Sequence, residues 1–201
     1  REEMTLTEKG KEILLENDYA SFGDKLDCPD RYKFARMVTK FFHDDEKYDS
    51  EAHNAPMVLS RELGKMESHN KHLPCIRKVR EIIRSEGDRI LFYMACNYCP
   101  GGINLINELK CLFSVRDRVK YLNLFKEEKH KLQELDLVEM TSISSLFGPQ
   151  TGLVLTDKGK ELFFEEDAKL FIQKVDKKDL VSCEDIKPKQ LFFSENEQRQ
   201  L

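Results

Sequence analysis

Residues 155–167 read LTDKGKELFFEED, and this stretch determines how the rest of the chain is interpreted. Nearly the same stretch occurs close to the start, where residues 6–18 read LTEKGKEILLEND, and eight of the thirteen positions are identical. Chance rarely produces similarity of this density, so the sequence predicts two copies of one supersecondary unit.

Each copy is expected to join a short apolar strand to a helix. Thr156, or Thr7 in the first copy, follows the strand and is predicted to cap the helix by accepting a free amide hydrogen of the first turn. Gly159, or Gly10, lies inside the helix, where glycine costs about 1 kcal/mol relative to alanine. A glycine retained there twice indicates close packing against a neighbouring backbone.

The residues before the second copy are predicted to form three helices and a hairpin. Apolar spacing predicts helices at 89–96, at 105–113 and at about 115–135. A strand at 137–143, a loop at 144–152 and a returning strand at 153–155 follow. Ile106 and Val119 fall on the apolar stripes of the second and third helices. The third stripe is interrupted at residues 126–131, where the helix is expected to bend or break.

This order is that of a winged helix, a helix-turn-helix followed by a two-stranded wing. The expected fold class is therefore mainly α with small β-hairpins, a partial first winged-helix unit being followed by a complete second one. The predicted domains are a mainly helical region at 1–87 that starts with the end of the first unit, a winged-helix domain at 88–168, and a linker at 169–201.

Composition narrows the class of protein. The 201 residues are 40% hydrophobic and 35% charged, which is typical of a globular chain, and no apolar run reaches the length of a membrane span. The six cysteines are scattered, which indicates reduced thiols and a cytoplasmic location. The net charge of −4 lacks the basic excess of a dedicated nucleic-acid binder.

Several strings resemble the N-terminal region of certain bacterial AAA-family ATPases. They are INELKCLF, EEKHKLQELDLVEM, SLFGPQTG and LVLTDKGKELFF, together with IKPKQLFFSENEQRQL, which resembles the entry into the ATPase module. The resemblance implies a non-catalytic accessory domain that positions the motor on a protein or nucleic-acid partner. It also implies that ATP and Mg, and any oligomer, belong to an ATPase module following residue 201.

Within these 201 residues the sequence predicts neither catalytic nor cofactor-binding residues. No G-x-x-x-x-G-K-[ST] motif occurs, so no loop is expected to cradle phosphates. The ATPase module itself is the first expected partner, and Leu191, Phe192 and Phe193 form an apolar group predicted to dock on it or on another copy of the chain.

The third helix is the candidate contact element for DNA or a protein. Its candidate contact cations are Arg116, Arg118, Lys120, Lys126 and Lys129, and they are interleaved with acidic residues. They would contact phosphates if the chain were a DNA-binding winged helix of a transcription or DNA-maintenance factor, which is the alternative function. The other interpretation is a solvated face with Lys/Glu pairs. Phe147, at the expected wing tip, is either a contact point or folds back onto the core.

Two further groups favour structural roles over chemical ones. Cys96 and Cys99 form a C-x-x-C, but structural zinc needs four ligands, and packing thiols are the favoured interpretation, so no metal site is predicted. The polar segment 43–56 contains His43, Asp44, Asp45, Glu46 and His53, for which solvated loop charge is favoured over a metal or acid–base site.

Overall fold

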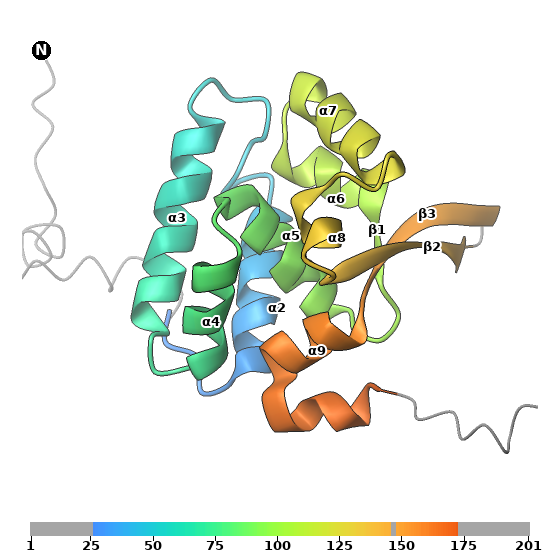
Figure 1. Ribbon diagram of the computed structural model, residues 1–201. Helices are drawn as coiled ribbons and strands as arrows, with labels where there is room; N and C mark the ends of the chain where they lie inside the picture. The colour runs from blue at the N-terminus through green and yellow to red at the C-terminus, as the bar shows by residue number, and fades with distance from the viewer. Residues whose placement is uncertain (1–25, 146–147, 173–201) are drawn as a thin grey trace, which may run out of the picture. The chain divides into compact units, whose positions relative to one another are not determined.

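The structure, a computed structural model, describes residues 26–145 and 148–172. The first copy of the repeat, at residues 6–18, lies outside this range, as do Phe147 and the apolar group Leu191, Phe192 and Phe193. Within the described ranges the chain is mainly helical with a small antiparallel sheet, as predicted (Figure 1). None of the described helices is long and apolar enough to cross a membrane.

Within the described residues, four helices precede the sheet, and five helical segments lie between its strands or follow it. The first group is α2 (Arg31–Phe42), α3 (Ala55–His69), α4 (Pro74–Ile82) and α5 (Glu86–Asn97). The rest of the chain runs β1 (Ile103–Asn104), α6 (Leu105–Leu112), α7 (Val115–Lys126), α8 (Lys131–Glu134), β2 (Val138–Ser145), β3 (Gly148–Leu155), α9 (Asp157–Phe164) and a 3₁₀ helix, η2 (Glu165–Leu170).

Helix α5 is the centre of the core. Every residue from Gly87 to Cys96 is buried, so this helix is covered on all sides by other elements. Helix α2 packs along it, with Phe34 meeting Tyr93 edge to face at 5.0 Å between ring centroids. Helices α3 and α8 and strand β3 also contact it. A helix buried on all sides provides the common core for both halves of the chain.

The core is shared across the domain boundary that the sequence suggested at residues 87 and 88. That boundary falls inside the first turn of α5, whose N-cap is Ser85. Helix α4 packs on α9, and Arg31 of α2 reaches the Phe164 carbonyl oxygen at the end of α9. Residues 26–171 therefore belong to one compact unit.

The predicted antiparallel hairpin is confirmed, but its loop is shorter than expected. Strands β2 and β3 pair from Val138↔Leu155 to Ser145↔Gly148, so most of residues 144–152 continue the strands instead of forming a loop. A third strand, β1, was not predicted. It pairs with β3 through Ile103↔Leu153 and gives the strand order β1-β3-β2.

The strand-to-helix junction that opens α9 agrees with the sequence prediction. Thr156 Oγ1 accepts a hydrogen bond from the Gly159 amide at 3.1 Å and donates one to the Asp136 carbonyl oxygen at 2.7 Å. Gly159 lies directly against the Leu137 backbone, where a β-carbon would overlap the carbonyl oxygen and come within 3.0 Å of the carbonyl carbon. The glycine thus permits α9 to lie against the start of β2.

A buried ionic cluster joins helices α3, α4 and α5. Glu67 of α3 is fully buried and accepts hydrogen bonds from Arg89 Nε at 2.8 Å and from the Tyr93 hydroxyl at 3.1 Å, both on α5. Arg80 of α4 approaches the second Glu67 oxygen at 3.3 Å. Because all three helices converge on one carboxylate, its removal would affect each of them.

Candidate interaction surface on helix α7

Helix α7 begins and ends at clear signals. The Ser114 hydroxyl oxygen accepts a hydrogen bond from the Asp117 amide at 3.4 Å, which caps the first turn. The helix stops at Lys126, and Glu128 then takes a positive φ of 57°. A second helix, α8, starts three residues later with His130 as its N-cap. The segment at about 115–135 is therefore two helices, and the break falls within residues 126–131, where the sequence predicted a bend or a break.

A small number of aromatic contacts hold α7 against the rest of the protein. Phe125 is the one fully buried residue of this helix, and the His130 imidazole stacks on it at 3.8 Å between ring centroids. Tyr121 stacks on Phe113 at 4.2 Å, and Gly87 at the start of α5 leaves room for the Phe113 ring. Burial raises the pKa of the Tyr121 phenol well above its usual value. These contacts use one side of α7 and leave the other side open.

The open side carries two apolar side chains one turn apart. Val115 is 61% exposed and Val119 is 56% exposed, although the apolar spacing had predicted that Val119 faces the core. Arg116 and Lys120 occupy the neighbouring row, and both are exposed. We call Val115, Arg116, Val119 and Lys120 the α7 face. On α6, Ile106 is likewise 53% exposed, against the prediction that it lines the core.

The predicted cations divide into two groups. Arg118 makes an ion pair with Glu51 and donates from Nε to the Phe113 carbonyl oxygen at 2.9 Å. Lys129 lies after the helix and pairs with Glu127 at 2.9 Å. The remaining cations, Arg116, Lys120 and Lys126, are exposed, and they form no ion pair with any residue in the described ranges. Only Arg116 and Lys120 among the predicted residues thus belong to the α7 face.

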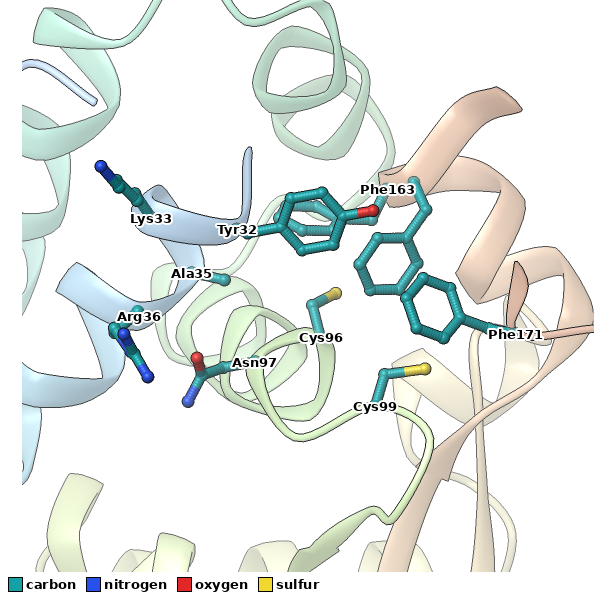
Figure 2. Close-up of a pocket in the computed structure, with 10 residues that line it drawn as sticks. Tyr32, Lys33, Ala35, Arg36, Cys96, Asn97, Cys99, Phe163 and Phe171 are labelled. Atoms are coloured by element: carbon teal, nitrogen blue, oxygen red, sulfur yellow. The ribbon is translucent and has the colours of Figure 1, made fainter. Parts of the chain in front are cut away.

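The C-x-x-C cysteines lie at the far end of α5 from this surface. Cys96 is buried and Cys99 is half-buried, and burial raises the pKa of both thiols. Both side chains line a cavity with aromatic walls, shown in Figure 2. Across the described residues, no group of three or more His, Cys, Asp or Glu side chains is arranged to hold a metal ion.

The polar segment 43–56 is anchored to α6. His43 Nε2 lies 2.6 Å from Glu108 Oε2, and this hydrogen bond raises the pKa of the imidazole against the opposing effect of burial. Tyr48 is buried and donates its hydroxyl hydrogen to the Leu112 carbonyl oxygen at 2.7 Å. Burial raises the pKa of Tyr48 to about 12. Glu108, which the sequence analysis had not singled out, gives His43 a structural partner.

Comparison with known proteins identifies no relative of this chain. No protein-family model, curated protein or solved structure matches the chain.

Proposed function

We propose that the region from α5 to α9 is a winged helix and that the chain is a non-catalytic interaction domain of an AAA-family ATPase. The order α5, β1, α6, α7, α8, β2, β3, α9 supports the first part, because apart from the four-residue helix α8 it corresponds to a helix-turn-helix followed by a two-stranded wing. On this interpretation α7 is the second helix of the helix-turn-helix, the element that winged helices commonly present to a partner.

The observation that carries the proposed function is the composition of the α7 face. Two valines that are each more than half exposed lie one turn apart, next to two cations that pair with no carboxylate of the described residues. An isolated exposed apolar residue is ordinary, but grouped apolar side chains rimmed by charge are characteristic of protein contacts. We infer that the α7 face binds a protein surface that offers an apolar contact with acidic residues around it.

The assignment to an ATPase depends on the sequence resemblance of residues 103–171 and of the C-terminal string. In such a protein the ATPase module would bind ATP and Mg, and this domain would hold the motor against its partner or substrate. A calorimetric titration of the chain with ATP and Mg is expected to show no binding, and tight nucleotide binding would overturn the assignment.

DNA binding through α7 is the second candidate function. The observation in its favour is that Arg116, Lys120 and Lys126 are exposed on the helix that enters the major groove in DNA-binding winged helices. The valines of the α7 face, the engagement of Arg118 with Glu51 and the net charge of −4 all favour a protein partner instead.

Site-specific photo-crosslinking in cells separates the two functions. A benzophenone amino acid is placed at Val119, and the matched control is Met57 on α3, which is 64% exposed. We expect Val119 to give an adduct with an AAA-family ATPase or its substrate protein, and Met57 to give none. A nuclease-sensitive adduct at Val119, with a salt-dependent gel shift weakened by Arg116→Gln and Lys120→Gln, would establish DNA binding. An equal yield at both positions would contradict both functions.

A further inference from the structure

The cavity beside the C-x-x-C cysteines is separate from the α7 face. It has a volume of about 310 Å³ and is bounded by α2, the end of α5, α9 and Phe171. This volume is far larger than one water molecule needs and lies at the lower end of the range for small-molecule sites. It is too small to hold a helix of another protein.

Aromatic rings form one side of the cavity. Tyr32 stacks on Phe164 at 5.6 Å between ring centroids, and Phe164 contacts Phe171 at 4.5 Å. The Tyr32 hydroxyl donates to Asp167 at 3.1 Å, which fixes the ring, yet Tyr32 remains 42% exposed. Figure 2 shows the thiols of Cys96 and Cys99 close to these rings. Rings and neutral sulfur atoms together form a polarizable surface suited to a flat apolar group.

The other side of the cavity is polar and positively charged. In Figure 2 the Arg36 guanidinium and the Asn97 carboxamide lie away from the rings, and the Lys33 amino group also points away from them. Neither Arg36 nor Lys33 forms an ion pair with any residue that the structure describes. None of the ten lining residues is acidic. An anionic group near Arg36 would therefore meet a positive potential with no carboxylate in the lining to oppose it.

We propose that this cavity binds a small molecule that combines an aromatic ring system with one anionic group. The ring system would lie against Tyr32, Phe171 and the two thiols, and the anion would pair with Arg36 and accept a hydrogen bond from Asn97. This site does not depend on the proposed function, because it shares no residue with the α7 face.

The test uses the full chain and two fluorescent probes that differ by one charge. Anilinonaphthalene sulfonate carries an aromatic body and a sulfonate, and N-phenyl-1-naphthylamine has the same body without the sulfonate. Arg36→Gln is expected to weaken sulfonate binding about fivefold and to leave the neutral probe unchanged. Lys40→Gln is the control, because it removes one exposed charge from the same helix at a residue that does not line the cavity. Equal effects of the two substitutions, or no effect of Arg36→Gln, would overturn the proposal.

A second measurement needs no variant. Cys99 lines the cavity and Cys111 does not, and both are half-buried. The rate of alkylation by iodoacetamide is followed for each cysteine by mass spectrometry. Saturating anilinonaphthalene sulfonate is expected to slow the alkylation of Cys99 several-fold and to leave that of Cys111 unchanged. If Cys99 reacts at the same rate with and without the probe, the probe binds elsewhere and the proposal is wrong.

Discussion

The substitution of glycine by alanine is expected to have opposite effects on stability at two helical positions, Gly64 and Gly159. Gly64 in α3 has no heavy atom within 4 Å of the place where a β-carbon would lie, whereas a β-carbon at Gly159 would overlap the Leu137 carbonyl oxygen. Alanine is favoured over glycine inside a helix by about 1 kcal/mol. At Gly64 that preference acts alone, but at Gly159 it is opposed by displacement of α9 from β2.

We therefore expect Gly64→Ala to raise the free energy of unfolding by about 0.5–1 kcal/mol. Gly159→Ala should lower it by about 1–3 kcal/mol, because the helix must shift away from the Leu137 backbone. Urea denaturation of both variants measures the difference. Stabilisation by both substitutions would show that Gly159 is not held against that backbone.

The junction at Thr156 and Gly159 shows which features of the fold can be predicted from local sequence. The cap at Thr156 and the close approach at Gly159 were predictable because each depends on a residue type at a fixed place in one helix. The pairs Arg118–Glu51 and His43–Glu108 were not, since each joins residues more than 60 positions apart. The cavity was missed for the same reason, because its lining residues come from α2, α5 and α9.

At the scale of elements, apolar periodicity predicted where the helices lie in the sequence, but it did not predict which of their faces are exposed. The spacing of Ile106 and Val119 matches an amphipathic stripe, yet both side chains are more than half exposed. Periodicity indicates which residues share a face of a helix, and it carries no information on whether another element covers that face. Strand β1 was missed because two residues are too few to show an alternating pattern.

The ionic cluster around Glu67 gives a prediction for the three helices that it joins. Glu67→Ala would leave the buried Arg89 with only the more distant Glu86 carboxylate, at 3.8 Å, and Tyr93 without its acceptor, and we expect a loss of about 3–5 kcal/mol of stability. Glu62→Ala on the same helix removes a half-buried carboxylate paired with the exposed side chains of Arg61 and Lys65, and should cost less than about 1 kcal/mol. Thermal denaturation of the two variants tests this, and similar costs would contradict the buried role of Glu67.

At the scale of the whole molecule, the buried helix α5 connects the first and the last described parts of the fold. Phe34 of α2 contacts Tyr93 of α5, and Tyr93 also contacts Phe163 of α9, so the aromatic core runs from the first described helix to the last part of the fold. On the surface, Lys78 of α4 forms an ion pair with Glu165 of η2 at 2.6 Å. A core continuous in this way should not separate into an early and a late part.

We therefore expect residues 26–171 to unfold in one cooperative step. Phe34→Ala should cost about 3–5 kcal/mol, because it opens a cavity at a fully buried ring. The loss should appear equally in the hydrogen-exchange protection of α3 and of the β2–β3 hairpin, although Phe34 belongs to neither. Met57→Ala, at an exposed residue of α3, is the control and should leave both unchanged. If the hairpin kept its protection while α3 lost it, the two parts would be separate folding units, and the division at residues 87 and 88 that the sequence suggested would describe the molecule better than a single shared core.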